Sequence, residues 1–341
     1  MVKILFDLNH PAHVHLFKNF IFFLRNNNHN VFVTARNKDS TYDLLEHYKI
    51  DYVRLSNPKK GLLGALLELV GRTVKLYMLN KKHNFPVAFG SSPSIALLTK
   101  IAGVQSINFN EDDDDTVPFF TKSTYPFTSK IVNPDCIIHN KWKSKRLFHS
   151  SLHELAYLHP NNFTPNRKVL QKYGLKEKEY IIVRFSALKA HHDISARGIS
   201  KNLWEKIESL LARFKIVKSI EFSINHEIDP WDMHHVLAFS KMLISDSQTM
   251  TIEGSVLGVP SIRINTFVGK SSVINELERK YGLAVGINPD QEKKIMDVIN
   301  EILNNPNSEQ IWADKQQKLL LDKEDLNGWI INYFNNEFVF S

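Results

Sequence analysis

The sequence predicts an α/β protein built from two doubly wound, Rossmann-like domains. Short apolar runs of strand length alternate with amphipathic segments of helix length, and this alternation starts again after a proline-containing middle stretch. The length of 341 residues also exceeds the size at which one hydrophobic core usually keeps growing. We therefore expect two domains, residues 1–163 and 164–341, each with a parallel sheet covered by helices on both faces.

The first domain is expected to begin with a regular β-α alternation. Strands are expected at 3–8, 30–35, 51–55, 86–90 and 104–110, with helices near 14–27, 40–48, 61–79 and 93–102. The stretch 116–165 is less periodic, and we place the domain junction near 160–165, because prolines punctuate this stretch at positions 118, 126, 134, 160 and 165.

The second domain is expected to repeat the same pattern. Strands are expected at 179–185, 216–224, 241–246, 260–264 and 283–287, with helices near 199–213, 231–240, 249–257 and 272–281. Residues 289–336 predict two or three amphipathic helices, and one of them is a candidate to pack back on the first domain.

Composition limits the class of protein. Hydrophobic residues make up 43% of the chain and charged residues 23%, as in ordinary globular proteins. The lone Cys136 cannot form an internal disulfide and no signal peptide opens the chain, so we expect a cytoplasmic location. The net charge of +7 indicates a phosphate-bearing partner, either a nucleotide diphosphate, an anionic lipid or a nucleic acid. No nucleic-acid-binding motif is present, and we do not expect nucleic acid as a partner.

The strongest motif is the segment SDSQTMTIEGSVLGVP at 245–260, which follows an apolar strand and opens a helix. Free amides around Ser247, Gln248 and Thr249, together with the positive end of the helix, favour binding of a phosphate. Glu253 lies about one turn further along the same face, where a carboxylate can accept hydrogen bonds from a ribose diol. The alternative is that Ser247 only caps the helix and Glu253 is a solvated charge.

The loop after the first strand contains His10, His13 and His15 before an apolar helix. Imidazole titrates near working pH, so a histidine here suits a general base. We favour His13, which lies mid-loop at the expected helix start, and Asp7 at the strand end is the second candidate. The alternative is a loop in which Asn9 and His10 only cap the helix. The spacing matches no standard zinc site.

Two further strand ends carry polar residues. Ser91 and Ser92 lie in GSSPS at 90–94 and are candidates to hold sugar hydroxyls or an acceptor phosphate, although Ser92 is also suited to cap a helix that has Pro93 at its first position. The run NEDDDD at 110–115 places five acids after a strand. These carboxylates are compatible with Mg²⁺, but the chemistry expected below does not require a metal or other cofactor.

The sequence resembles the DUF354 proteins of the GT-B superfamily. That family typically has "DSQTMTxEaaVLGxPsiR", "FDLNHPAHVHLFK" and "ELAYLHPxxFTPxxxVL", which are matched here at 246–263, 6–18 and 154–170. The 245–260 segment is also similar to the DSGGxxEE and LGxP pattern of non-hydrolysing UDP-N-acetylglucosamine 2-epimerases, with Gln248 and Thr249 in place of two glycines. The resemblance implies two Rossmann-like domains facing each other across a cleft, the GT-B fold.

The resemblance also implies roles for particular residues. The first loop, with His10 and His13, would line the acceptor side, and Glu111 matches the position of the glutamate in the epimerases' HVEAG motif. Cationic residues would neutralise the departing diphosphate; the candidates are Arg184, Lys189, His191 and His192 in the loop at 184–193, and Arg263, for which a structural ion pair is the alternative. The remaining acids of 110–115 are interpreted as solvent-facing.

The resemblance favours sugar transfer over epimerisation. The epimerases carry an aspartate where this chain has Gly90, Ser91 and Ser92, and their second acidic motif has no convincing match here. We therefore expect an inverting glycosyltransferase with a nucleotide-sugar donor, in surface polysaccharide or glycolipid synthesis. A UDP-sugar 2-epimerase or hydrolase is the first alternative, and a non-catalytic nucleotide-sugar-binding protein is the second. The acceptor would be a saccharide or a lipid-linked molecule.

The apolar segment 61–79 bears on location. It is interrupted by Glu68, Arg72 and Lys75, so it does not predict a transmembrane helix. Flanking lysines at 59, 60, 81 and 82 make peripheral contact with an anionic membrane one interpretation. A core or interdomain helix is the other.

Overall fold

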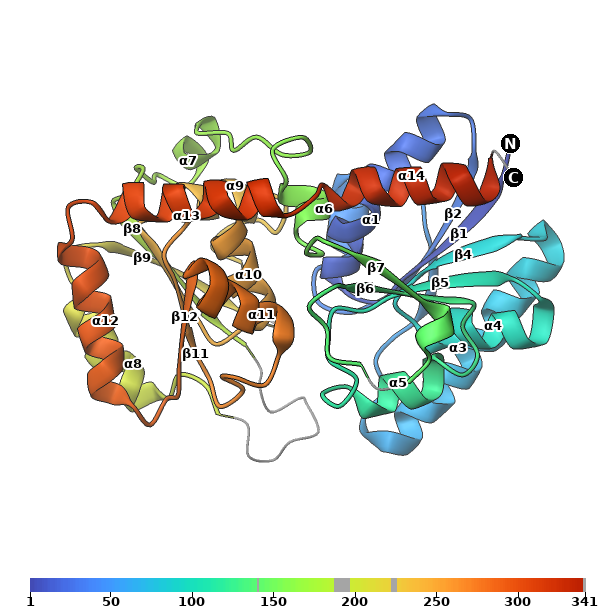
Figure 1. Cartoon of the computed structure of the whole chain (residues 1–341), viewed down its shortest axis with the longest axis horizontal. Coiled ribbons are helices and arrows are strands. Elements are labelled where there is room, and N and C mark those ends of the chain that lie inside the picture. Colours follow the sequence, from blue (N-terminus) through green and yellow to red (C-terminus); the bar gives the residue numbers. More distant parts are fainter. Residues whose placement is uncertain (140, 187–196, 222–225, 340–341) are drawn as a thin grey trace. The chain divides into compact units, whose positions relative to one another are not determined.

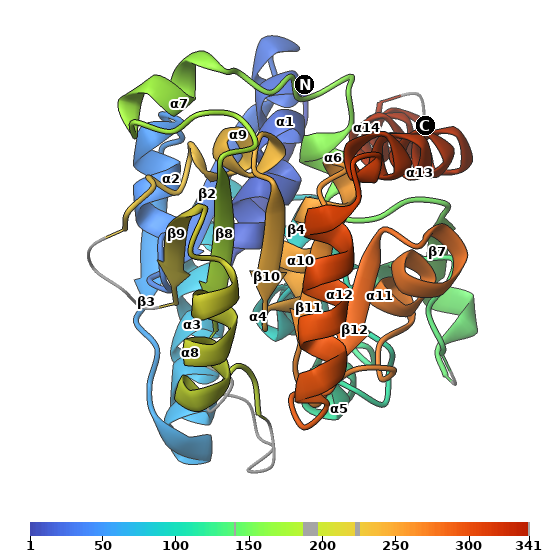
Figure 2. The same ribbon diagram turned by 90° about the vertical axis from the view of Figure 1, so that its left-hand side faces the viewer.

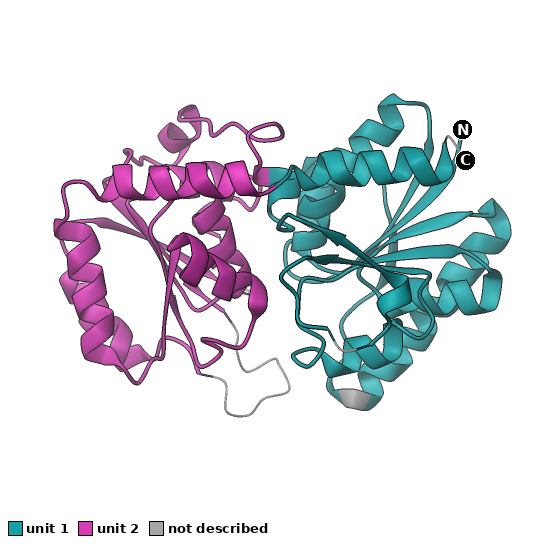
Figure 3. Cartoon of the chain, viewed as in Figure 1, with its two compact units in different colours: residues 1–157, 324–341 teal, residues 158–323 magenta. Residues whose placement is uncertain are grey.

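A computed structural model describes residues 1–139, 141–186, 197–221 and 226–339, and the chain divides into two compact units (Figure 3). Unit 1 comprises residues 1–157 and 324–341, and unit 2 comprises residues 158–323. The placement of the units relative to one another is not determined. The first change of unit falls within the short helix α6 (Leu155–Leu158).

Unit 1 is built on a seven-stranded, all-parallel sheet in the order β3-β2-β1-β4-β5-β6-β7 (Figure 1). The expected strands are present as β1 (Lys3–Leu8), β2 (Asn30–Arg36), β3 (Val53–Ser56), β4 (Val87–Gly90) and β5 (Gln105–Phe109). β1 and β4 are central and, apart from the exposed Lys3, buried along their length, as expected of parallel strands covered by helices on both faces; the charged Asp7 lies among these buried positions.

The stretch expected to be irregular contains two further strands, β6 (Lys130–Pro134) and β7 (Arg146–His149). They extend the sheet beyond β5, with Ile131 opposite Arg146 in register. Both are short, and β6 ends on a proline near the sheet edge, which is why apolar periodicity did not reveal them. A short helix, α5 (Pro118–Thr124), and a 3₁₀ turn, η1 (Lys143–Lys145), complete this stretch.

Helices cover both faces of the unit 1 sheet. α1 (Pro11–Asn26) contacts α2 (Thr41–His47) on one face, while α3 (Gly61–His83) contacts α4 (Pro93–Ala102) on the other. The change of face follows from the right-handed crossovers, because the chain moves outward from β1 to β3 and then returns to β4. No helix in the described part of the chain has the length and apolar character needed to cross a membrane.

The C-terminal helix α14 (Leu326–Phe338) belongs to unit 1 and packs on α1, as Figure 3 shows in teal. Its Phe334 is fully buried against the rings of Phe20 and Phe89, with centroid distances of 5.6 and 6.4 Å. The chain therefore returns to the N-terminal sheet after completing unit 2.

Unit 2 contains a five-stranded parallel sheet in the order β12-β11-β10-β8-β9. Its strands agree with those expected: β8 (Tyr180–Phe185), β9 (Lys215–Ile220), β10 (Met242–Ser245), β11 (Ser261–Ile264) and β12 (Ala284–Ile287). The hydrophobic core on one side of this sheet gathers Tyr180, Ile182, Leu237 and Leu243. The two parallel, helix-covered sheets confirm the predicted class.

The helices of unit 2 also divide between the sheet faces. α8 (Lys201–Leu210) and α12 (Glu292–Asn304) contact one another and lie side by side in Figure 2. A second group is centred on α10 (Gln248–Val256), which contacts both α9 (Met233–Ala238) and α13 (Ser308–Asp322). The remaining helical segments are α7 (Lys168–Lys172), α11 (Ser272–Glu276) and a π-helical turn, η3 (Leu277–Tyr281).

Each sheet has one point at which the strand order reverses direction. In unit 1 it lies between β1 and β4, and in unit 2 between β8 and β10. Ligands of open parallel sheets bind outside the carboxyl ends of the strands at such points. The loops after these four strands are therefore where a binding site is expected on fold grounds.

Candidate functional site

The unit 2 part of the site is the turn from β10 into α10. The Ser245 hydroxyl accepts from the backbone N–H of Ser247 at 2.9 Å and donates to the carbonyl of the same residue at 3.2 Å. Ser247 in turn caps α10, because its Oγ accepts from the N–H of Met250 at 3.5 Å. The first-turn amides at Gln248 and Thr249 have no acceptor within an α-helix, so this turn presents donors and the positive end of the helix dipole.

Asp246 ties the ends of β8 and β10 together. Its carboxylate accepts from the backbone N–H of Ser186 at 2.5 Å, and its own N–H donates to the Arg184 carbonyl at 3.3 Å. Burial is the largest influence on this carboxyl and raises its pKa above the ordinary value, against the lowering effect of the Ser186 hydrogen bonds. Asp246 thus fixes the strand-order reversal beside the start of α10.

Glu253 is almost completely buried and lies 2.9 Å from the Nε2 atom of His234 on α9. Since a carboxylate can only accept, the ring donates from Nε2 and fixes the carboxylate's orientation. The alternative of a solvated Glu253 is therefore wrong. No motif in the sequence indicates His234, which reaches Glu253 from another helix, α9.

The cationic candidates differ in their surroundings. The Arg184 guanidinium is half-buried and donates to Ser219 Oγ at 2.8 Å. Arg263 has no exposed surface and binds Glu278 with an Nη2 to Oε1 distance of 2.9 Å. The prediction that Arg263 contacts a donor is corrected accordingly, because an arginine sealed inside the unit by an ion pair does not reach a ligand. His191, with Lys189 and His192, lies outside the described residues.

In unit 1, Asp7 is held inside a buried ion pair. Both of its carboxylate oxygens accept from Arg72 Nη2 at 2.7 Å, and Oδ1 also accepts from Thr34 Oγ1 at 2.9 Å. Asp7 has no exposed surface and Arg72 is nearly as buried. This pairing does not support the prediction of Asp7 as a catalytic acid or base, since its oxygens anchor Arg72 on α3.

The ion pair continues into a network on α3. Glu68, one turn before Arg72, accepts from Arg36 at 2.7 Å and from Ser56 Oγ at 2.7 Å. Arg72 also donates to Ser56 Oγ at 3.2 Å. The bonds from Arg36 and Ser56 lower the pKa of Glu68 despite its burial, which acts in the opposite direction. The charged residues that interrupt 61–79 are thus turned toward the sheet edge.

The loop after β1 is ordered by its own side chains. His10 caps α1 by accepting from the N–H of Ala12 at 3.2 Å, which is the capping role given above as the alternative for this residue. Asn9 accepts from Arg72 and donates to the Ser91 carbonyl at 3.3 Å. The Asn9 backbone N–H donates to His13 Nδ1 at 3.3 Å. The neutral His13 ring therefore carries its proton on Nε2.

The loop after β4 lies against the β1 loop at the strand-order reversal. A Cβ atom at Gly90 would sit 2.8 Å from the Asp7 carbonyl oxygen, so the close approach of these two strand ends requires glycine. Ser92 is completely buried and caps α4 by accepting from Ser94 N–H at 3.1 Å. Its predicted contact with sugar is therefore corrected to a structural role, whereas Ser91 is half-buried beside Asn9.

Glu111 follows β5 and meets a histidine that the sequence did not indicate. Its Oε2 lies 3.5 Å from Nδ1 of His153, which precedes α6. Burial lowers the pKa of His153 to about 3, with His13 adding to the effect. Burial likewise lowers the pKa of His13 to about 4, helped by Lys38. Both rings are neutral at pH 7, and Glu111, His13 and His153 come together at one edge of the sheet.

The other acids of 110–115 are not simply solvent-facing, and this prediction was wrong for two of them. Asp113 is buried and accepts from the N–H of Ile138 at 2.8 Å, while Asp114 pairs with Arg146 at 2.6 Å. Asp112 is half-buried, and burial followed by repulsion from Asp113 raises its pKa to about 6. The carboxylates of Asp113 and Asp114 thus bind different protein groups, the Ile138 N–H and the Arg146 guanidinium, and are not directed at one shared position where Mg²⁺ would bind.

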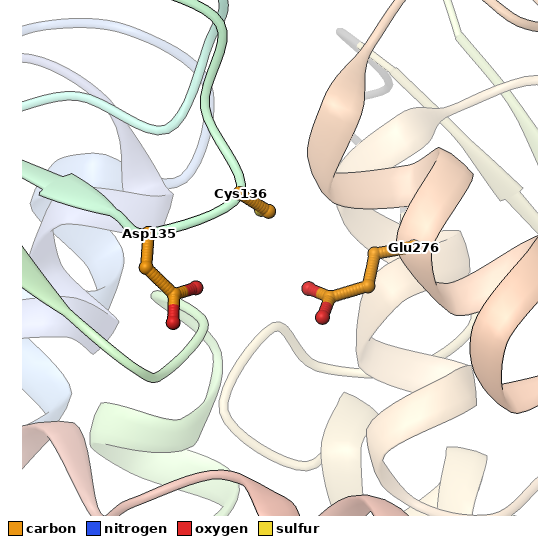
Figure 4. A group of neighbouring side chains, drawn as sticks. All are labelled: Asp135, Cys136 and Glu276. Atoms are coloured by element: carbon orange, nitrogen blue, oxygen red, sulfur yellow. The ribbon is translucent and has the colours of Figure 1, made fainter.

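Figure 4 labels three residues with side chains of the kinds that bind metals, Asp135, Cys136 and Glu276. Asp135 and Cys136 belong to unit 1, whereas Glu276 belongs to unit 2. Because the placement of the units relative to one another is not determined, we assign no metal to this group.

Solved structures share this architecture over nearly the whole chain. S. aureus MnaA in complex with UDP superimposes with a TM-score of 0.70 at 11% identity, covering 98% of this chain and 96% of that one. The UDP-GlcNAc 2-epimerase of Neisseria meningitidis bound to UDP-GlcNAc gives 0.65 at 10% identity, covering 98% and 100%. The glycotransferase of kitacinnamycin gives 0.63 at 12% identity, covering 98% and 99%.

These likenesses, at such low identity, establish the fold: two Rossmann-like domains of the GT-B type. A search among curated proteins found no match. The family model described as "Protein of unknown function (DUF354)" matches residues 2–337. The chain therefore belongs to the DUF354 family.

Proposed function

We propose that this protein is a glycosyltransferase that takes a sugar from a nucleotide-sugar donor and passes it to an acceptor hydroxyl. The observation that carries the proposal is the start of α10, where Ser247, Gln248 and Thr249 follow β10 at the strand-order reversal of unit 2. A helix start at such a position binds the diphosphate of a nucleotide. Similar structures that contain UDP or UDP-GlcNAc support this choice of donor.

The surrounding side chains suit the rest of a nucleotide. The hydroxyls of Ser247 and Thr249 add donors beside the first-turn amides of α10. The Glu253 carboxylate, oriented by His234, accepts hydrogen bonds from the ribose hydroxyls. Arg184, half-buried on β8, supplies positive charge for the diphosphate as it leaves.

The acceptor is assigned to unit 1. A hydroxyl placed beside Glu111 and His13 accepts a hydrogen bond from His13 Nε2, because Nδ1 already accepts from Asn9. That tautomer leaves the Glu111 carboxylate as the group that takes the proton, in place of His13. The acceptor oxygen then bonds to the anomeric carbon, the bond from that carbon to the diphosphate breaks, and the nucleotide leaves with inversion. The setting that we propose is surface polysaccharide or glycolipid synthesis.

Donor binding is tested by thermal unfolding with UDP, UDP-sugars and other nucleotide-sugars. A ligand at 100 times its Kd stabilises the folded protein by about 2.7 kcal/mol, which raises Tm by several degrees. Ser247→Asp keeps a capping oxygen but adds a negative charge beside the phosphates, so it should remove this rise. Ser247→Asn is the neutral control that also caps. No rise with any nucleotide-sugar, or an unchanged rise in Ser247→Asp, would refute the donor site.

The likeness to epimerase structures makes 2-epimerisation the second candidate. Incubation of the protein with UDP-GlcNAc alone, followed by NMR of the sugar, separates the reactions. A transferase leaves the configuration at C2 intact and releases little UDP until acceptor extract is added. Inversion at C2 would favour the epimerase, and rapid release of UDP without acceptor would favour a hydrolase. Binding without turnover in the presence of acceptor extracts would indicate a non-catalytic protein.

A further inference from the structure

The helix α3 is amphipathic in the reverse sense of an ordinary surface helix. Its charged residues Glu68 and Arg72 are buried and paired with groups of the sheet edge. Large apolar side chains face outward instead, and their exposed fractions are Leu63 70%, Leu66 51%, Leu67 55%, Val70 54%, Val74 45% and Met78 64%. Surface helices normally turn such residues toward the core.

These six residues, named here the α3 stripe, form a continuous surface. Their positions follow the i, i+3, i+4, i+7 pattern, which at 3.6 residues per turn places them on one side of the helix over an arc of about 120°. Tyr77, half-buried, lies within the same arc. Scattered exposed apolar residues are normal, but a contiguous row along a helix of six turns marks an interaction surface.

The charges around the α3 stripe are all positive. Lys59 and Lys60 precede the helix, Lys81 and Lys82 lie in its last turn, and all four are exposed. Glu68 is the single acid between positions 57 and 84, and its charge is neutralised by Arg36. A second copy of this chain does not complement this surface, because pairing two stripes in either direction would bring lysines against lysines.

An anionic bilayer does complement it. A helix with an apolar side and basic residues at both ends lies in the plane of the membrane, with its apolar side in the headgroup and acyl boundary. Each lysine near an anionic leaflet strengthens binding roughly fivefold. We propose that the α3 stripe and its four flanking lysines dock this protein on the surface of an anionic lipid membrane.

An open pocket of about 710 Å³ beside the stripe fits the same occupant. Leu67 of the stripe lines it, together with Tyr42 and the cations Arg54, Lys59 and Lys75. Within the pocket wall Arg72 is paired with Asp7 and Glu68 with Arg36, while Arg54 is paired with Glu46. Lys59 and Lys75 therefore give the lining its net positive charge. A phosphate-bearing lipid headgroup suits this lining. This inference about the acceptor rests on the proposed function: if the protein transfers a sugar, a lipid headgroup bound in this pocket means that the acceptor hydroxyl is part of a lipid-linked molecule.

Membrane docking is measured by co-sedimentation of the full chain with vesicles, without any nucleotide-sugar. We expect binding to phosphatidylcholine vesicles that contain about 30% of the anionic lipid phosphatidylglycerol, weaker binding to pure phosphatidylcholine, and loss of binding at high salt. Since the assay contains no donor, its failure would leave the donor site untouched, and failure of donor binding would leave docking untouched.

Two sets of variants locate the surface. Leu66→Ser with Val70→Ser should weaken binding at least about tenfold by removing buried apolar area. Replacing the four flanking lysines by Ala should weaken it about 100-fold or more. All six positions are exposed, so Tm should be preserved. Leu321→Ser and the double variant Lys293→Ala/Lys294→Ala, exposed positions in unit 2, are the matched controls and should bind as the wild type.

Three outcomes would overturn the proposal. The first is no binding to either kind of vesicle. The second is binding that the stripe and lysine variants leave unchanged. The third is a concentration-dependent dimer, seen by sedimentation velocity, that Leu66→Ser with Val70→Ser abolishes, which would assign the stripe to a second copy of the chain.

Discussion

At the scale of single residues, the acids of unit 1 acquire different roles from their surroundings. Asp7 is buried between Arg72 and Thr34, and its carboxylate accepts hydrogen bonds from both, so it stabilises the fold. Glu111 is half-buried beside His153 and faces the edge of the sheet where ligands bind. Asp7 and Glu111, which both lie at the carboxyl ends of strands, therefore differ in role: Asp7 belongs to a structural ion pair, whereas Glu111 is placed where it can contact a ligand.

Glu111→Gln tests the proposed base. The amide cannot take a proton, so kcat should fall by about 10² to 10⁴ while KM for the donor changes little. Donor binding followed by thermal shift should be unaffected, because Ser247 and its neighbours lie in unit 2. Asp43→Asn, an exposed acid of the same unit, serves as the control. A Glu111→Gln enzyme with full kcat would exclude Glu111 as the base.

Asp112 should make stability depend on pH in an unusual direction. Burial raises the pKa of this carboxyl to about 6, above the value of 3.8 in an unfolded chain. Below pH 3.8 Asp112 is protonated in both the folded and the unfolded protein, and it does not lower the free energy of unfolding. As pH rises from 4 through 6 the carboxyl ionises more readily in the unfolded chain, so the free energy of unfolding falls. Asp112→Asn should therefore stabilise the protein by about 1 to 3 kcal/mol above pH 7 and by nothing below pH 4.

Urea unfolding of the wild type and Asp112→Asn measures this difference in the free energy of unfolding. The range from pH 4 to pH 8 extends about two units to either side of the raised pKa. Asp51→Asn, an exposed aspartate, should show no such trend. A gain from Asp112→Asn that is the same at both ends of the range would contradict the role of ionisation.

At the scale of elements, α3 is held to the sheet by charges and not by an apolar face alone. Glu68 and Arg72, one turn apart, bind groups from β1, β2 and β3. This arrangement frees the opposite side of the helix to carry the α3 stripe. By comparison, α1 buries the usual apolar residues, with Phe17 and Phe20 fully covered.

Arg72→Met should destabilise the protein by about 3 to 5 kcal/mol, because it leaves the Asp7 carboxylate buried without its cation. Adding Asp7→Asn to this variant removes the uncompensated charge and should restore a large part of the loss. Arg54→Met, which breaks the exposed pair with Glu46, should cost less than about 1 kcal/mol. Equal effects of Arg72→Met and Arg54→Met on the free energy of unfolding would contradict the assignment.

At the scale of the whole molecule, the chain leaves unit 1 at residue 157 and returns to it at residue 324. Unit 1 is completed by α14, in which Phe334 packs against the rings of both Phe20 and Phe89. The N-terminal sheet thus depends on the last segment of the chain, and the two units cannot be separated by a single cut.

Phe334→Ala should cost about 3 to 5 kcal/mol of stability, because it leaves a cavity among buried rings. The effect should appear in urea unfolding monitored on unit 1, while affinity for the nucleotide-sugar stays unchanged, since the proposed donor site belongs to unit 2. Val339→Ala, at a largely exposed position of the same C-terminal segment, should be neutral. Loss of donor affinity in Phe334→Ala would place part of that site outside unit 2.

The sequence by itself determined the features that depend on neighbouring residues. The apolar runs of β1, β4, β8 and β10 are continuous because parallel strands are buried on both faces, and such runs are visible without a structure. The Ser247 cap and the helix that it starts are equally local, as are the caps of His10 and Ser92.

Only the tertiary structure decided which polar groups meet. Asp7 and Arg72 are 65 positions apart, and His153 reaches Glu111 from a stretch whose periodicity predicts nothing. Pairing of Arg263 with Glu278, of Asp114 with Arg146 and of Glu253 with His234 likewise depends on how helices pack on the sheets. A charge in a sequence shows only that a partner or water is needed, and the fold determines which of the two it finds.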